Sequence, residues 1–185
     1  PDKNALSFKR NPHDKEASHY TYSEGREYVR DLATEFINMG VRDKKIAIIG
    51  EAAPEWVFAY FSLMSTGTVT VPVDKELMAE DVLNILTVSE SKAMFVDDKS
   101  YEKLQEIKDR LPQDFTFIGL DEIEGLKNID ELIKLGEELL EKGDRTFLDA
   151  EIDSDGLGSL LFTSGTTGMA KGVMLSQRNI VEDIM

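Results

Sequence analysis

Cysteine is absent from this sequence of 185 residues. Its absence excludes disulfide bonds, a thiolate nucleophile and a zinc site built on cysteine. Histidine is scarce, because His13 and His19 are the two that occur, and both lie near the start of the chain. We expect each of them to be an exposed or hydrogen-bonded structural residue rather than a catalytic imidazole.

Basic residues are also in short supply. Lysine and arginine number 21 against 36 aspartate and glutamate residues, which gives a formal net charge of −15. Nucleic acids and anionic membrane surfaces are bound through clusters of cationic side chains, so both kinds of partner are disfavoured. No apolar run has the length that a transmembrane helix needs. We expect a cytoplasmic protein, with peripheral contact to a membrane left open.

Short apolar runs alternate with helical patterns along the chain. Apolar residues at a 3.6-residue spacing predict a helix over residues 23–39, with Thr21 or Ser23 as its N-cap and Gly40 at its end. A second helix is expected to open at Pro54 and to end before Gly67. Other predicted helices cover residues 79–88, 101–110, 129–141 and 177–185, and predicted strands cover 45–50, 68–72, 93–97, 115–118, 160–162 and 173–175.

This alternation predicts βαβ units. We therefore expect an α/β fold with a mainly parallel sheet that helices cover on both faces. Trp56 and the aliphatic stripes of the helices are assigned to the core and not to a binding site. The acidic excess between residues 97 and 155 is interpreted as solvated helix faces and loops.

The segment from Thr163 to Gly172 is the chemically informative one, since it holds four hydroxylated residues, three glycines and a lysine. Glycines let backbone N–H groups approach an anion closely, hydroxyls add short donors, and Lys171 adds a compact positive charge. A polyphosphate needs these groups. The residues predicted to bind a nucleotide are Thr163, Ser164, Gly165, Thr166, Thr167, Gly168 and Lys171. The alternative is a surface hairpin, rich in serine, threonine and glycine, that binds nothing.

Two familiar motifs do not fit this segment. A Walker A loop needs Gly-Lys-Ser/Thr, but Ala170 precedes Lys171 and Gly172 follows it. A strand is also predicted after the segment, where a Walker A loop opens a helix. The nucleophile elbow of hydrolases needs glycine two positions before the serine, where this sequence has Phe162.

The run from Phe162 to Val173 resembles the phosphate-loop signature of the AMP-binding superfamily, whose adenylate-forming members include acyl-CoA synthetases, firefly luciferase and peptide-synthetase adenylation domains. Earlier segments resemble further boxes of this family in the same order: Thr-Tyr-Ser-Glu at 21–24, Pro-Glu-Trp at 54–56, and the segment 63–74, which ends Val-Pro-Val-Asp. Residues 89–98 and 129–138 resemble long-chain fatty acyl-CoA synthetases in particular. The resemblance covers nearly the whole chain.

The resemblance implies ATP-dependent activation of a carboxylic acid, expected to be a fatty acid, to an acyl-adenylate and then to a thioester of coenzyme A. It implies Mg²⁺ together with the ATP, and a contact between the metal and Thr163. A strand-end threonine that faces solvent is the alternative for that residue. Two other functions stay open: an aryl- or amino-acid-adenylating ligase that acts on coenzyme A or a carrier protein, and a non-catalytic phosphate-binding module.

The same resemblance implies that residues 1–185 are the first part of an N-terminal AMP-binding domain. The catalytic residues, the rest of that domain and the C-terminal lid domain are expected downstream of Met185. The 185-residue chain alone is therefore expected to be inactive.

The sequence departs from the family pattern in four places, which involve five residues. Ala170 stands where proline is common, Gln177 where histidine is usual, Ala52 and Ala53 where asparagine and serine are usual, and Gly25 where leucine is usual. The pair of alanines removes a side-chain cap from the helix that Pro54 opens. None of the four departures removes a predicted phosphate contact.

Overall fold

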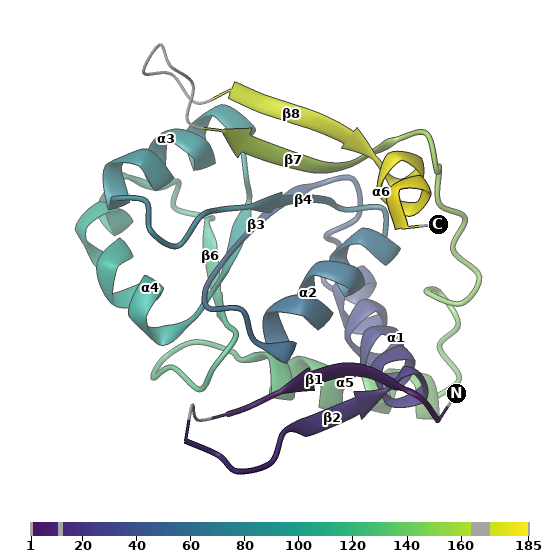
Figure 1. The fold of residues 1–185 in the computed structure, drawn as a ribbon. Helices are drawn as coiled ribbons and strands as arrows, with labels where there is room; N and C mark the ends of the chain where they lie inside the picture. Colours follow the sequence, from purple (N-terminus) through teal and green to yellow (C-terminus); the bar gives the residue numbers. More distant parts are fainter. Residues whose placement is uncertain (1, 11–12, 164–170, 185) are drawn as a thin grey trace.

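The computed structural model describes residues 2–10, 13–163 and 171–184. They form a six-stranded sheet, a separate two-stranded hairpin and the surrounding helices (Figure 1). The strand order in the large sheet is β6-β5-β3-β4-β7-β8. Its strands are β3 Lys45–Ile49, β4 Val69–Pro72, β5 Ala93–Val96, β6 Thr116–Gly119, β7 Leu157–Thr163 and β8 Lys171–Ser176. Neighbouring strands are parallel except β7 and β8, which confirms the predicted α/β fold.

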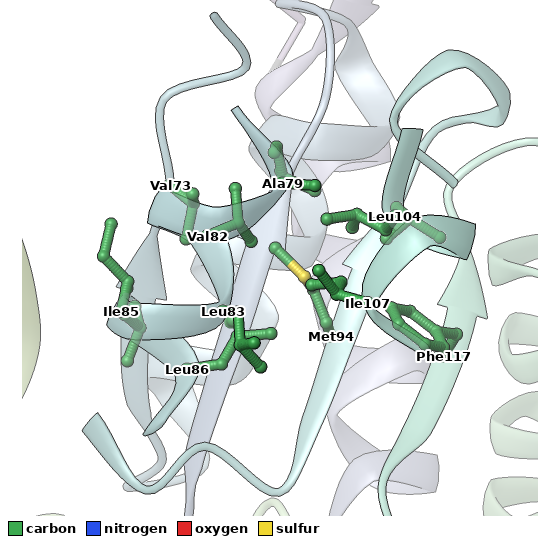
Figure 2. Close-up of a cluster of buried hydrophobic side chains, with 14 of the residues drawn as sticks. Val73, Ala79, Val82, Leu83, Ile85, Leu86, Met94, Leu104, Ile107 and Phe117 are labelled. Atoms are coloured by element: carbon green, nitrogen blue, oxygen red, sulfur yellow. The ribbon is translucent and has the colours of Figure 1, made fainter. Parts of the chain in front are cut away.

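Helices cover both faces of this sheet. The bounds are α1 Tyr22–Asn38, α2 Pro54–Ser65 and α5 Ile129–Glu141 on one face, and α3 Ala79–Ser89, α4 Asp98–Leu104 and the 3₁₀ helix η1 Gln105–Arg110 on the other. Each face has its own hydrophobic core. Along β3, Ile46 and Ile48 belong to the first core, which α1, α2 and α5 cover, while Ala47 and Ile49 belong to the second core, which α3, α4 and η1 cover. Figure 2 shows Met94 of β5 in the second core, between the side chains of α3 and those of Leu104 and Ile107.

The ends of the helices follow from local chemistry. Thr21 begins α1 with a capping box: the Glu24 N–H donates to the Thr21 hydroxyl, and the Thr21 N–H donates to the Glu24 carboxylate. Gly40 follows α1 with φ at +68°, the left-handed conformation that favours glycine. Ala53 gives α2 no side-chain cap, as the sequence predicted.

The helix predicted over residues 101–110 is displaced in the structure. It begins at Asp98, because the Asp97 carboxylate accepts a hydrogen bond from the Ser100 N–H at 2.8 Å. After Leu104 the chain tightens into the 3₁₀ helix η1. Pro112 restricts Leu111 to an extended conformation, so the chain must leave helical geometry there, and a tight last turn is a common way to end.

A hairpin of β1 (Asn4–Phe8) and β2 (Ser18–Thr21) precedes α1 and was not predicted. Aromatic rings seat it on the helices, with the Tyr20 ring edge-on to Phe58 at 5.0 Å between centroids. A Cβ atom on Gly25 would lie 3.1 Å from the Phe58 ring, so this ring fills the space that a larger side chain would need. His19 is exposed, with its Nδ1 2.8 Å from the Ser7 hydroxyl, in the structural role expected for it.

Helices α1 and α5 meet at a glycine. A Cβ atom added to Gly136 of α5 would lie 1.8 Å from the backbone carbonyl oxygen of Asp31 in α1. Because a backbone atom cannot swing aside as a flexible side chain can, the two helices approach each other closely only with glycine at this position.

We expect Gly136→Ala to destabilise the protein by about 1–3 kcal/mol or more through this clash, although alanine is the better helix former by about 1 kcal/mol. Urea denaturation followed by circular dichroism measures the change. Exposed Lys134 in the same helix provides the control, because the Lys134→Ala variant should be more stable than the Lys134→Gly variant. Equal preference for alanine at both positions would contradict the close contact.

Candidate functional site

The predicted phosphate-binding segment joins β7 to β8. The two strands are antiparallel, and Thr163 at the end of β7 lies opposite Lys171 at the start of β8. Both residues are exposed. Because β7 runs parallel to β4, Thr163 lies at the edge of the sheet where the parallel strands have their carboxyl ends (Figure 1). The structure thus brings together the first and last of the predicted nucleotide-binding residues.

The other predicted nucleotide-binding residues, Ser164, Gly165, Thr166, Thr167 and Gly168, lie outside the described residues, as does Ala170. Their contacts with phosphate stay predictions. The flanking structure confirms one distinction drawn from the sequence, because a strand follows the segment where a Walker A loop would open a helix.

Side-chain packing holds β7 in place. Ser159 is fully buried, and its hydroxyl donates to the Thr70 carbonyl of β4 at 3.2 Å. Leu160 and Phe162 pack against the core that contains α3. Gly172 of β8 lies against Leu160, since a Cβ atom at Gly172 would be 2.9 Å from that side chain. The ends of the hairpin are thereby fixed against the sheet.

Helix α6 (Gln177–Ile184) follows β8 and secures its far end. Ser176 caps it as predicted, since its hydroxyl accepts from the Asn179 N–H at 3.1 Å. Gln177 donates through its side-chain amide to the Met64 carbonyl at the end of α2, at 2.7 Å. The residue that departs from the family pattern here therefore makes a structural contact between α6 and α2.

Asp97 joins two of the loops that leave the carboxyl edge. Its side chain accepts from the Glu51 N–H after β3 and from the Ser100 N–H in α4, each at 2.8 Å, and the residue is 8% exposed. Burial acts to raise the pKa of Asp97, but the hydrogen bonds from Ser100 and Glu51 outweigh it and hold this pKa below its ordinary value. Asp97 was not among the predicted site residues, although an aspartate directly after a strand and three residues before a serine fits an N-cap.

Two lysines connect this network to the loop after β4. The Lys75 ammonium group lies 2.5 Å from the Glu51 carboxylate, and Lys103 donates to the backbone carbonyls of Lys75 and Leu77 at 2.6 and 2.8 Å. Glu51 is thus held at its backbone by Asp97 and at its side chain by Lys75. The loops after β3, β4 and β5 consequently form one connected rim beside the β7–β8 hairpin.

Among the described residues, no three His, Asp or Glu side chains are grouped so as to hold a metal ion. The part of the chain that the structure describes also holds no helix both long and apolar enough to cross a bilayer. The described part of the site comprises the Thr163 hydroxyl and Lys171, at the facing ends of β7 and β8, and the hydrogen-bonded rim.

The family model for the AMP-binding enzymes matches residues 1–185. The chain belongs to the AMP-binding enzyme family.

Curated members of the AMP-binding enzyme family are similar in sequence. The chain is 34% identical over 179 residues to the long-chain-fatty-acid–CoA ligase heimdall of Drosophila melanogaster, covering 88% of this chain and 25% of the relative. It is 30% identical over 189 residues to a chloroplastic long-chain-fatty-acid–[acyl-carrier-protein] ligase, AEE15, of Arabidopsis thaliana, covering 89% and 25%. The chain spans about a quarter of the length of these relatives.

A solved structure shares the fold. The crystal structure of the anthranilate CoA ligase AuaEII in complex with anthranoyl-AMP superposes with a TM-score of 0.73 at 21% sequence identity. The match covers 87% of this chain and 30% of that one.

We expect Asp97→Asn to destabilise the protein by about 1–3 kcal/mol at neutral pH, because asparagine keeps one accepting oxygen for the N–H groups of Glu51 and Ser100. A carboxylate whose pKa is lowered in the folded state stabilises that state above its unfolded pKa of about 4 and loses the effect as the pH falls. The deficit of the variant should therefore shrink toward pH 3 in urea titrations. A deficit that does not change with pH would rule out this role for the carboxylate.

Proposed function

We propose that the intact protein activates a fatty carboxylic acid with ATP and transfers the acyl group to the thiol of coenzyme A. The observation that carries this proposal is the placement of Thr163 opposite Lys171 at the carboxyl edge of the sheet, at the two ends of a loop of glycines and hydroxylated residues. Ligands of open α/β sheets bind outside the carboxyl ends of the strands. Membership of the AMP-binding family supports the same reaction.

In the first step a carboxylate oxygen attacks the α-phosphorus of ATP. The bond from that phosphorus to the bridging oxygen breaks, and pyrophosphate leaves with the electron pair. Lys171 and the hydroxyl and N–H groups of residues 163–168 would bind the β- and γ-phosphates and stabilise the charge that develops on the leaving group. The thiolate of coenzyme A then displaces AMP to form the thioester.

Mg²⁺ enters with ATP as part of the substrate. The described residues provide no cluster of carboxylates for it, so the phosphate oxygens would be its main ligands, as is usual for Mg²⁺ in such sites. The exposed hydroxyl of Thr163, at the carboxyl edge, is the described side chain that we assign to it.

A carrier-protein thiol is the second candidate acceptor, favoured by the similarity to the Arabidopsis ligase that acts on acyl-carrier protein. Offering the intact protein a fatty acid, ATP and either coenzyme A or a carrier protein separates the two. An aryl or amino acid substrate is tested in the same assay by carboxylate-dependent release of pyrophosphate. Release without any preference for fatty acids would reject the substrate part of the proposal.

We expect Lys171→Gln to reduce kcat/KM for ATP by about a hundredfold, the order found when one donor to a developing charge is removed. Carboxylate-dependent pyrophosphate release measures it. Lys142→Gln at the end of α5 provides a matched control, because Lys142 is exposed and pairs with Glu138. Equal turnover by both variants would contradict the assignment of Lys171 and of the loop.

We also expect the 185-residue chain alone to form no acyl-adenylate. It spans about a quarter of its ligase relatives, and the family's catalytic residues are expected beyond Met185. Carboxylate-dependent exchange of labelled pyrophosphate into ATP tests this, with the intact protein as the positive control. Exchange by the short chain would show that residues 1–185 hold a complete catalytic set.

A further inference from the structure

A cavity opens at the ends of the strands opposite to the β7–β8 hairpin residues Thr163 and Lys171. It has a volume of about 330 Å³ and lies beside the amino-terminal ends of β3, β5 and β6, on the face that α1 covers. Ile46, Ala93 and Thr116 border it, one from each of these strands. This volume lies at the small end of the range of about 300–1,000 Å³ typical of small-molecule sites.

The floor of this cavity is apolar. Phe36, Phe95 and Ile118 form much of it, and each is almost wholly buried. Met39, at the end of α1, borders the same space and is 37% exposed. A methionine side chain is unbranched and adapts readily to a neighbour, so Met39 is the element of the wall that can move aside for an apolar chain.

Charged side chains border the mouth. Lys44 and Lys92 are exposed, and neither ammonium group forms an ion pair or hydrogen bond with another residue in the described ranges. Neighbouring Lys45 is already paired with Glu90 at 3.2 Å. Asp114 is the carboxylate at this mouth, so the balance there is one positive charge, in a chain whose net charge is −15.

We propose that this cavity binds an amphipathic monocarboxylate, a fatty acid of medium chain length, with its tail on the apolar floor and its carboxylate at Lys44 and Lys92. The limited volume favours a medium chain over a long one. The charge at the mouth selects an anion over a neutral lipid. This site is separate from the hairpin at Thr163 and Lys171, and it does not depend on the activity proposed above.

Photoaffinity labelling of the intact protein tests the proposal and separates this site from any substrate pocket. The probe is a decanoic acid that carries a diazirine on its tail, and mass spectrometry maps the labelled peptides. We expect label within residues 36–46, 92–95 or 114–118. Unlabelled decanoate should compete for it, and decanol should compete poorly. Absence of label in these peptides, or equal competition by decanol, would overturn the proposal.

Variants that remove a positive or a negative charge at the mouth of the cavity provide a second test. We expect Lys44→Gln and Lys92→Gln each to weaken binding by about threefold, as for one partly exposed charge pair, and the double variant by about tenfold. Asp114→Asn should strengthen binding by about threefold, because it removes the repelling carboxylate. A loss of fold would not produce this gain.

Lys127→Gln is the control, since Lys127 is exposed after the carboxyl end of β6, at the other edge of the sheet. It should leave labelling unchanged. Turnover of ATP should be unaffected in all four single variants. Labelling in the cavity that is indifferent to Lys44, Lys92 and Asp114 would refute recognition of a carboxylate there.

Discussion

Burial of β3, β4 and β5 between two layers of helices constrains every other feature of this structure. Apolar side chains of β3 are directed alternately into both cores, so apolar packing fills the middle of each face of the sheet. The polar chemistry must lie at the two ends of the strands. Parallel pairing then gathers all the carboxyl ends at one edge, so residues far apart in sequence, such as Glu51, Lys75 and Asp97, become neighbours.

Side-chain contacts cross-link the loops at the carboxyl edge. Asp97 satisfies two backbone N–H groups from separate loops, and Lys103 ties down the loop after β4. Because Lys75 and Lys103 are held by a carboxylate and by carbonyl groups, they serve structure at this edge. In so acidic a chain a nucleotide would gain little from general electrostatic attraction. Binding of a nucleotide at the β7–β8 hairpin, as proposed above, would therefore depend on local attraction by Lys171.

Much of this architecture could be predicted from the sequence, because the helices and strands from α1 onward have strong periodic patterns. The helix at 129–141 was predicted with its observed bounds, and Thr21, Gly40, Pro54 and Ser176 mark helix ends by well-understood capping chemistry. The β1–β2 hairpin escaped prediction because its strands are short and mostly exposed, so alternation leaves little signal. Its position depends on the contact between Tyr20 and Phe58, which are distant in sequence.

The surroundings of the predicted site could not be predicted from the sequence. The content and motif of residues 163–172 led to a predicted site whose phosphate contacts stay predictions, whereas the bond from Asp97 to the Glu51 N–H exists only once β3 and β5 lie side by side. Likewise, nothing local in the sequence shows that Gly136 must be small, because the obstacle is the carbonyl of Asp31 in another helix. Long-range contacts of this kind depend on how the strands and helices are arranged in space. The periodic patterns of the sequence predict only the α/β fold class.

The position of the β7–β8 hairpin depends on side-chain packing more than on hydrogen bonding to the rest of the sheet. Strands β7 and β8 pair along their length, but β7 is registered with β4 at Thr70 opposite Ser159, near the start of β7. Beyond that point Leu160 and Phe162 hold β7 against the core that α3 completes. The same core includes Val73 and packs against Leu77, in the loop that Lys75 and Lys103 secure. The apolar interior thus connects the rim of the carboxyl edge to Thr163, so that the position of this exposed polar residue is set by buried apolar residues of the core.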